Sequence, residues 1–444
     1  MKKRLLIIFI ILILCVAAAT AVFFLINKEG EPTATTPTTT QETTTAEPAK
    51  PIYSEGLEFQ LYEAENVYFL KGIGVCADED LRIPPEYNGL PVTRIASNAF
   101  NECDFIKSVT VPRSVTYICY LAFANCPALE SVTLSEGVVA HIEKGAFFNS
   151  PSIKSFFVPR SLTKINYGTF YTKSDMMQTP AIVNLYYQGT IEDWYKIEFN
   201  EDGSIFYGNL YCAGELIEDI TIPAEIAETK KNVFNCCQSL KRVTIEEGAK
   251  SIADNMFCGC ASLESVTLPD SLTEIGAGVF NFCRVLTEIK LPSSVKSIGI
   301  EAFNGSGITS IDLPESLETI GVCAFDSTPL TSIDIPNGIT VLETALFQNC
   351  TKLESVTLTD GLTTINRNSF GSCSSLKTIN IPTSVTHISG LAFQHCDSLT
   401  DIYFDGTFEE WYAIKKESDW YTFNTHPTRS FTVHCLDMDY TYRK

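Results

Sequence analysis

Residues 263–283 read LESVTLPDSLTEIGAGVFNFC, and this unit recurs with little change through the second half of the chain. Further copies begin at Leu286, Ile308, Leu330, Leu353 and Leu376. Aligning the copies on the phenylalanine near their end gives a set spaced 22 or 23 residues apart: Phe234, Phe257, Phe280, Phe303, Phe325, Phe347, Phe370 and Phe393. An earlier set, spaced 23 or 24 residues apart, consists of Phe100, Phe123, Phe147 and Phe170. Twelve copies at so constant a period predict a repeat architecture.

The start of each unit has the pattern of a half-buried β-strand. Val266 and Leu268 alternate with Ser265 and Thr267, which is the period of a strand with one apolar and one polar face. Pro269 ends this strand because proline has no backbone N–H to donate to a ladder. The sequence therefore predicts a short strand whose serine and threonine side chains face the solvent.

The rest of the unit supplies more apolar residues than one unit can bury. A second short apolar alternation, Leu272 and Ile275, leads into Gly276, and Val279 and Phe280 point inward again. Stacking equivalent residues of neighbouring units would bury them in continuous ladders. The predicted fold is a β-rich repeat solenoid with one or two short parallel strands in each turn of 22–24 residues.

The pattern L-x-x-I-x-[IL]-P-x-[SG]-[VLI]-x-x-I-x-x-x-A-F-x-x-C resembles the BspA-like class of leucine-rich repeats, which is widespread on bacterial surfaces. The resemblance covers about residues 55–436. It implies a surface-displayed solenoid that serves in adhesion or binding, and it implies no particular ligand.

The N-terminal segment has the pattern of a membrane anchor. Basic residues 1–4 precede an uninterrupted apolar run, residues 5–26, which is long enough to span a bilayer as a helix. The positive flank predicts a cytoplasmic N-terminus and an exported C-terminal body on a single-pass protein at the cell membrane. Cleavage after Ala17–Ala19, which would release a secreted protein, and a lipoprotein processed at Cys15 are alternatives. Residues 27–52 are rich in threonine and proline and predict a disordered linker.

The remaining chain divides into two repeat blocks with caps. Residues 53–94 predict an N-terminal cap that begins with a β-hairpin turning near Glu65–Asn66, residues 95–170 form block 1, and residues 216–401 form block 2. One tryptophan-containing motif occurs twice at a constant offset. It reads NLYYQGTIEDWYKIEF in residues 171–215 and DIYFDGTFEEWYAIKK at the C-terminal cap, 402–444. Trp194 and Trp411 in this motif are candidate aromatic cap contacts. They could stack on a ligand, but a helical closure packed on the last coil is the preferred interpretation. Whether 171–215 separates two solenoids or interrupts one stays open.

Cysteine usage predicts buried free thiols. Of 16 cysteines, eight occupy one repeat position: Cys103, Cys126, Cys237, Cys260, Cys283, Cys350, Cys373 and Cys396. Ser150, Ser306 and Thr328 occupy the same position in other repeats, and these side chains cannot form a disulfide. The position therefore predicts a small packing slot in which cysteine acts as an apolar residue. Without a spaced CxxC pair, no metal site and no cofactor are expected.

Charge and motif content exclude several function classes. The formal net charge of −21, from 53 acidic and 32 basic residues, argues against a nucleic-acid partner. The metalloprotease, serine-hydrolase, P-loop and dinucleotide-binding motifs are all absent from the sequence. We therefore expect a protein that is not an enzyme.

The outward positions of the repeated strands form the candidate ligand face. They are mostly short polar side chains, and in block 2 they are Arg242, Thr244, Ser265, Thr267, Glu288, Lys290, Ser310, Asp312, Ser332, Asp334, Ser355 and Thr357. Few aromatic or arginine anchors are expected on this face, which would suit an extended peptide or a glycan.

Two hypotheses of different classes follow. The first is a surface-anchored module that binds an unknown extracellular protein or glycan. The second is a structural spacer or display rod without a specific ligand. A third and weaker hypothesis is an enzyme whose site lies in 171–215 and uses Asp193, Glu201 and Asp202.

Overall fold

The computed structural model describes residues 53–137, 141–165, 183–199, 207–421 and 430–443. The predicted transmembrane segment, 5–26, and the predicted linker, 27–52, lie outside these residues, as do Phe170, Glu201 and Asp202. Within the described ranges, no helix is both long and apolar enough to cross a bilayer. The predictions for the N-terminal segment therefore stay predictions.

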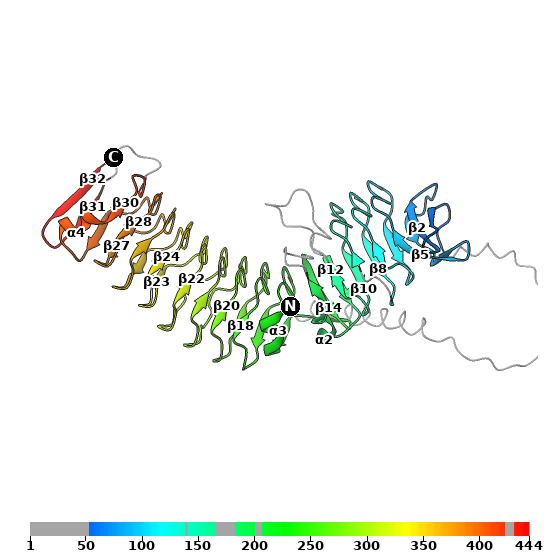
Figure 1. Cartoon of the computed structure of the whole chain (residues 1–444), viewed down its shortest axis with the longest axis horizontal. Coiled ribbons are helices and arrows are strands. Elements are labelled where there is room, and N and C mark those ends of the chain that lie inside the picture. The colour runs from blue at the N-terminus through cyan, green and yellow to red at the C-terminus, as the bar shows by residue number, and fades with distance from the viewer. Residues whose placement is uncertain (1–52, 138–140, 166–182, 200–206, 422–429, 444) are drawn as a thin grey trace, which may run out of the picture. The chain divides into compact units, whose positions relative to one another are not determined.

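The described chain is a β-solenoid in which most coils contribute two short strands. In the coil that begins at Leu263, the front strand is β19 (Ser265–Thr267) and the back strand is β20 (Glu274–Ile275). Front strands pair in parallel with front strands, and back strands with back strands, so that the coils stack through two ladders (Figure 1). We call these ladders the front sheet and the back sheet. The predicted repeat solenoid with one or two short parallel strands per turn is confirmed.

The front sheet is assembled from strands with alternating buried and exposed residues. Its first part comprises β3 (Asp80–Arg82), β6 (Ser108–Val111), β8 (Ser131–Leu134), β10 (Ser155–Val158), β12 (Val183–Tyr187), β14 (Gly208–Cys212) and the antiparallel β15 (Glu215–Leu216). It continues as β16 (Asp219–Ile222), β17 (Arg242–Ile245) and β19, then β23 (Ser332–Asp334) and β25 (Ser355–Thr357). Its last part comprises β27 (Thr378–Ile381), β29 (Asp401–Phe404), β31 (Ser430–His434) and the antiparallel β32 (Asp439–Arg443).

The back sheet has shorter strands in most coils. Its first part comprises β1 (Glu58–Tyr62), β2 (Val67–Gly72), β5 (Leu90–Ile95) with β4 (Glu86–Tyr87), β7 (Tyr117–Ile118), β9 (His141–Ile142), β11 (Lys164–Ile165) and β13 (Glu198–Phe199). It continues as β18 (Ser251–Ile252), β20, β21 (Ser297–Ile298) and β22 (Thr319–Ile320). The last four strands are β24 (Val341–Leu342), β26 (Thr364–Ile365), β28 (His387–Ile388) and β30 (Lys415–Lys416).

Stacked phenylalanine rings run through the centre of the coils, as the repeat spacing predicted. Phe100, Phe123 and Phe147 stack with centroid distances of 4.8 and 5.3 Å. The rings from Phe234 to Phe393 stack in the same way, with centroid distances of 5.3–6.2 Å. These rings are at most 1% exposed. Because each ring contacts its equivalents in both neighbouring coils, one coil alone could not bury its ring.

The repeated cysteines are free, buried thiols, in agreement with the packing slot predicted for them. They also have a role that was not predicted, because most of them donate a hydrogen bond to the carbonyl of the ladder phenylalanine in the preceding coil. The Sγ–O distance is 3.0–3.2 Å at Cys126, Cys260, Cys283, Cys350, Cys373 and Cys396. Ser150 makes the equivalent bond to the Phe123 carbonyl at 2.9 Å, which explains why serine can replace cysteine here.

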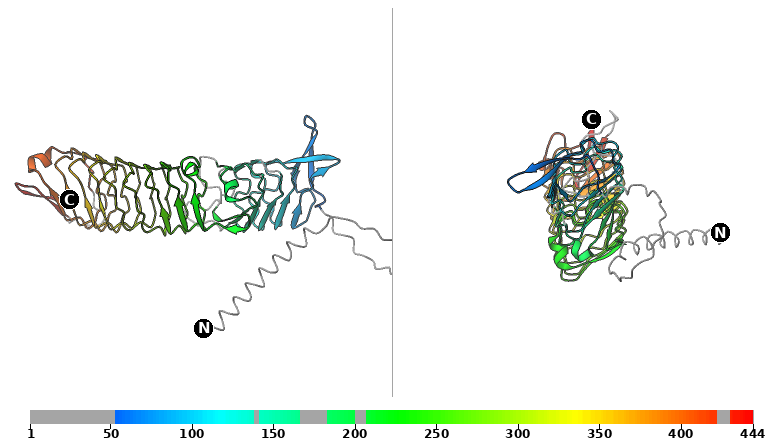
Figure 2. Two further views of the ribbon diagram at one scale, coloured as in Figure 1. Left: turned by 90° about the horizontal axis from the view of Figure 1, so that it is seen from below. Right: turned by 90° about the vertical axis from the view of Figure 1, so that its right-hand side faces the viewer.

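Hairpins lie at both ends of the stack, and short helices lie at its C-terminal end and in its middle (Figure 2). The predicted N-terminal hairpin is present as the antiparallel pair β1–β2, and β31–β32 forms a second hairpin near the C-terminus. The two copies of the tryptophan motif fold as α2 (Ile191–Trp194) and α4 (Phe408–Ala413). Each begins with a threonine capping box, Thr190 with Asp193 and Thr407 with Glu410. The third described helix, α3 (Ala224–Thr229), follows β16.

Candidate functional site

The residues of the predicted ligand face lie on the front sheet and are exposed. Those on β17, β19, β23 and β25 alternate with inward-pointing residues, as the sequence period indicated. Arg242 forms an ion pair with Asp219 of β16, whereas most other members are short hydroxyl or carboxylate side chains. The face is therefore a polar strip that crosses successive coils.

The front sheet is interrupted in the middle of this strip. Residues 287–291 and 309–313 occupy the front positions of two successive coils, and neither segment forms a β-strand. The coils nevertheless stay in contact, because the backbone N–H of Thr309 donates to the carbonyl of Thr287 at 3.0 Å. The back strands β20, β21 and β22 also pair without a break through the same coils. Only the front strands separate.

A groove of about 710 Å³ lies at this interruption. The predicted face residues Ser265, Glu288, Lys290, Ser310 and Asp312 line its walls. The floor of the groove is apolar. It is lined by Val266, Ile289, Ile311 and Leu313, which occupy repeat positions that point toward the core in the regular coils. The groove thus combines an apolar floor with a polar and mainly acidic rim, a combination that is typical of ligand sites.

Two shortened turns lie on either side of the second interrupted segment. The connections from Phe303 to Ile308 and from Phe325 to Leu330 are each one residue shorter than the connection from Phe280 to Leu286. A shorter turn changes where the chain enters the front position, and parallel pairing requires the strands to enter in register. The change of phenylalanine spacing from 23 to 22 residues therefore marks the second interrupted segment in the sequence, whereas the first, 287–291, follows a turn of ordinary length.

Three aromatic rings form a row on the outer surface of the front sheet that the sequence did not predict. Phe157, Tyr186 and Tyr211 occupy paired outward positions of β10, β12 and β14, and their rings stack at 4.7 and 4.6 Å. They are half-buried, and partial burial raises the pKa of Tyr186. Asn184 and Asn209 form a parallel row of hydrogen-bonded amides at 2.9 Å. The expectation that this face has few aromatic anchors is therefore wrong for β10, β12 and β14.

The back sheet has a similar row in which a cation replaces one ring. The Arg94 guanidinium lies 5.2 Å from the Phe69 ring centre and 4.6 Å from that of Tyr117. His141 stacks on Tyr117 at 5.1 Å, and Tyr62 stacks on Phe69 at the same distance. The arginine charge is thus held by cation–π contacts within the fold.

Both candidate tryptophans are fully buried. Trp194 packs against Tyr187 and donates its indole N–H to the Val233 carbonyl at 3.0 Å. Trp411 packs against Phe404 and donates to the Tyr442 hydroxyl at 3.1 Å. Neither ring face is open to the solvent, so the two tryptophans offer no surface on which a ligand could stack.

Of the three acidic residues considered as catalytic candidates, Asp193 alone lies within the described residues, and its contacts are structural. Its carboxylate accepts bonds from Lys196 and Arg160 at 2.8 and 2.9 Å and completes the capping box of α2. The Lys196 hydrogen bond is the main reason that the pKa of Asp193 falls to about 2. Across the described ranges, no group of three or more His, Cys, Asp or Glu side chains is arranged to hold a metal ion.

The repeats match a known family along most of the chain. A family profile described as "BspA type Leucine rich repeat region (6 copies)" matches residues 89–191, 205–329 and 318–414. The chain belongs to the BspA-type leucine-rich repeat family. A comparison with curated proteins finds no match. The profile describes a repeat architecture and indicates no catalytic family.

Solved structures of leucine-rich repeat and surface proteins are similar to this chain at low sequence identity. The pneumococcal vaccine antigen PcpA is 19% identical, with a TM-score of 0.57 over 84% of this chain and 98% of that chain. A leucine-rich cell surface protein from Faecalibacterium prausnitzii is 24% identical over 83% and 99% of the two chains, with a TM-score of 0.42. A leucine-rich repeat protein from Bacteroides ovatus is 20% identical over 84% and 99%, with a TM-score of 0.45.

Proposed function

We propose that this BspA-type protein is a cell-surface binding module and that its ligand occupies the groove on the front sheet. The observation that carries the proposal is the 710 Å³ groove, because it lies within the strip of exposed residues chosen from the sequence alone. Surface display rests on family membership and on the predicted anchor, 5–26. An unknown extracellular protein or glycan is the expected partner.

The chemistry of the groove favours an extended polar ligand. Glu288 and Asp312 offer carboxylates, Lys290 offers an ammonium group, and Ser265 and Ser310 offer hydroxyls that both donate and accept hydrogen bonds. The apolar floor of Ile289 and Ile311 adds surface that a ligand removes from water. A flat, fully paired front sheet would offer the polar groups without the floor.

The test is a binding screen of the full-length protein, kept in solution with a mild detergent, against immobilised extracellular-matrix proteins and glycans. Replacing Ser310 by arginine places a long charged side chain across the groove. We expect Ser310→Arg to weaken binding at least roughly tenfold, which is the effect of losing about 1.4 kcal/mol of interaction.

The matched control is Ser355→Arg, which makes the same change at an equivalent exposed position outside the groove. It should bind like the unmodified protein. If both variants bound the ligand equally well, the binding site would have to lie outside the groove. If the unmodified protein bound nothing in the screen, the spacer hypothesis would replace the proposal.

A further inference from the structure

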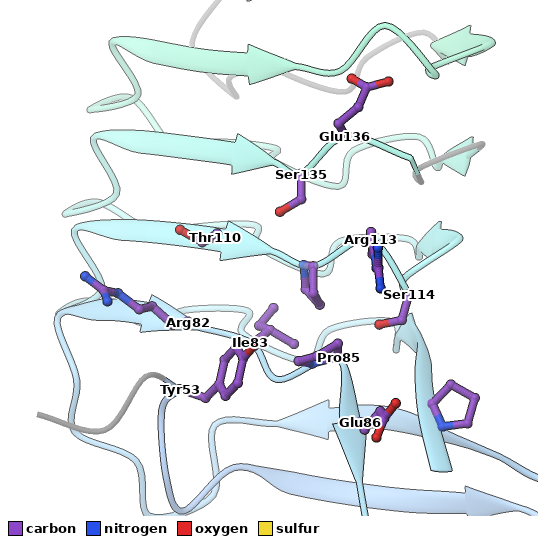
Figure 3. Close-up of a pocket in the computed structure, with 12 residues that line it drawn as sticks. Tyr53, Arg82, Ile83, Pro85, Glu86, Thr110, Arg113, Ser114, Ser135 and Glu136 are labelled. Carbon is purple, nitrogen blue, oxygen red and sulfur yellow. The ribbon is translucent and has the colours of Figure 1, made fainter. Parts of the chain in front are cut away.

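A second and larger pocket lies beside the N-terminal cap, away from the groove. It has a volume of about 870 Å³, within the range of small-ligand sites (Figure 3). Tyr53, Ile83, Pro85 and Pro112 supply apolar surface, and the side chain of Tyr53 is 44% exposed. The pocket is formed where the first two front strands, β3 and β6, run into the turns that follow them.

Two arginines without ionic partners line this pocket. Arg82 and Arg113 are both exposed, and no carboxylate of the described residues lies within ion-pair distance of either guanidinium. Two other cations in these coils do form ion pairs, since Lys107 pairs with Glu79 and Arg160 pairs with Asp193. In a chain with a net charge of −21, two such guanidinium groups line the same pocket.

The pocket also offers hydroxyl groups with free bonding capacity. The Oγ atom of Ser114 is buried and has no hydrogen-bond partner among the described residues. Thr110 and Ser135 add two more hydroxyls to the lining. A ligand can bond to Ser114 only if this side chain rotates toward the pocket, and it would then recover part of the roughly 1–3 kcal/mol that a buried hydroxyl without a partner costs.

The two acidic residues of the lining sit at its ends. Figure 3 shows Glu136 beyond Ser135 on one side and Glu86 below Pro85 on the other. The Glu136 carboxylate already accepts a hydrogen bond from the backbone N–H of Arg160 at 2.9 Å. The lining thus places acids at the ends and leaves the apolar surface and Arg113 between them.

We propose that this pocket binds an anionic saccharide, meaning a sugar that carries a carboxylate or sulfate group. Guanidinium forks bind such oxyanions through two parallel hydrogen bonds. The carbon-bound hydrogens of a sugar ring would lie on Tyr53 and the prolines, and its hydroxyls would bond to the serine and threonine side chains. β3 is the edge strand of the front sheet, and Ser54 already occupies its edge at Arg82. The backbone N–H of Ser54 donates to the Arg82 carbonyl at 2.9 Å, and the backbone N–H of Arg82 donates to Ser54 Oγ at 3.0 Å, so a peptide strand has no bonding groups of Arg82 left to pair with. The proposal does not depend on the groove.

The experiment measures affinity of the full-length protein in mild detergent for three probes, a sialylated trisaccharide, a hexuronate disaccharide and a sulfated disaccharide. Each probe is compared with its neutral parent, and the probe bound best identifies the anionic group. We expect at least one anionic probe to bind roughly tenfold more tightly than its parent. The double variant Arg82→Gln/Arg113→Gln should lose this preference.

The control double variant, Arg284→Gln/Arg367→Gln, removes the same charge from exposed positions outside the pocket and should keep the preference. Equal binding of anionic and neutral probes by the unmodified protein would overturn the proposal. A preference that survives Arg82→Gln/Arg113→Gln, or that the control also loses, would do the same. A hexaglutamate peptide that binds as tightly as the best saccharide would reassign the pocket to acidic protein segments.

Discussion

Single side chains explain why the repeat tolerates some substitutions at the cysteine position and not others. A thiol or a hydroxyl fits because each can donate to the phenylalanine carbonyl of the preceding coil, as Cys126 and Ser150 do. Ser306 occupies the same slot, and its hydroxyl has no partner among the described residues. Burial raises the pKa of the Cys283 thiol well above its ordinary value, so this sulfur stays protonated and unreactive.

At the residue scale, His434 also holds the C-terminal hairpin β31–β32 in place through two hydrogen bonds, an arrangement that we call the His434 clamp. His434 on β31 stacks on Tyr403 at 4.8 Å. Its Nε2 atom lies 2.8 Å from a carboxylate oxygen of Asp401, and its Nδ1 atom lies 2.9 Å from one of Asp439. The hydrogen bond with Asp401 is the main cause that raises the pKa of His434, and the same bond lowers the pKa of Asp401.

The His434 clamp predicts a pH-dependent contribution to stability. The pKa of His434 is higher in the folded chain than its ordinary value of 6.5, so its stabilisation is complete below pH 6.5 and is lost as the pH rises through the folded pKa. The pKa of Asp401 is lowered from 3.8, so its contribution is present above pH 3.8 and is lost below it. We expect His434→Gln to lower the melting temperature more at pH 5.5 than at pH 9. An equal decrease at both values would contradict the clamp.

At the scale of elements, the chain uses one closure motif in two ways. In both copies a front strand leads into a threonine-capped helix whose tryptophan is buried. Phe199 packs on Trp194 in the internal copy, whereas Lys416 takes its place on Trp411 and donates to the Trp411 and Ile414 carbonyls. Burial lowers the pKa of Lys416 to about 8. The largest difference between the two copies is at the residue that follows the tryptophan. Tyr195 is 4% exposed, whereas Tyr412 is 78% exposed.

This difference predicts unequal effects of the same substitution. The Tyr195 ring packs edge-on against Phe234 at 6.2 Å, which joins the internal closure to the next phenylalanine ladder. Tyr195→Ala should therefore destabilise the protein by about 3–5 kcal/mol, the usual cost of truncating a buried aromatic side chain. Tyr412→Ala, the matched control, should change stability by less than about 0.5 kcal/mol. Denaturant unfolding measures the loss in the free energy of unfolding for both variants. Similar losses would show that Tyr195 does not join the internal closure to the following phenylalanine ladder.

At the scale of the whole molecule, the stacked coils make stability a sum of local contributions. Each coil contacts its neighbours through the phenylalanine ladder, the thiol bonds and the two sheets. Repeat proteins of this kind can lose or gain whole units while each remaining interface is preserved. The buried core extends in this way from Leu57 to Val433.

Removal of one complete repeat should therefore leave a folded protein. Deletion of residues 330–352 joins Pro329 to Leu353, the first residue of the next copy, and keeps the register of both ladders. Deletion of residues 330–340, although shorter, shifts the register and should unfold the coils around it. Circular dichroism and limited proteolysis distinguish the two outcomes. A whole-repeat deletion as disordered as the partial one would contradict the additive description.

The sequence by itself determined the solenoid, because a ring at Phe257, Phe280 and Phe303 can be buried only by its equivalents in adjacent coils. It also determined which residues of the front strands face outward, since a strand alternates its faces strictly. The same local pattern predicted the N-terminal hairpin and the helical fold of the tryptophan motif. These features depend on residues within one repeat or its direct neighbours.

Only the tertiary structure decided where the surface opens and which side chains meet on it. The groove arises where front strands fail to pair, and pairing depends on how successive coils enter the sheet. Phe157, Tyr186 and Tyr211 are 29 and 25 residues apart, which departs from the repeat period of 22–24, so the period did not place these rings together. Arg82 and Arg113 share a pocket because stacking brings two coils together, and no spacing along the chain encodes that distance.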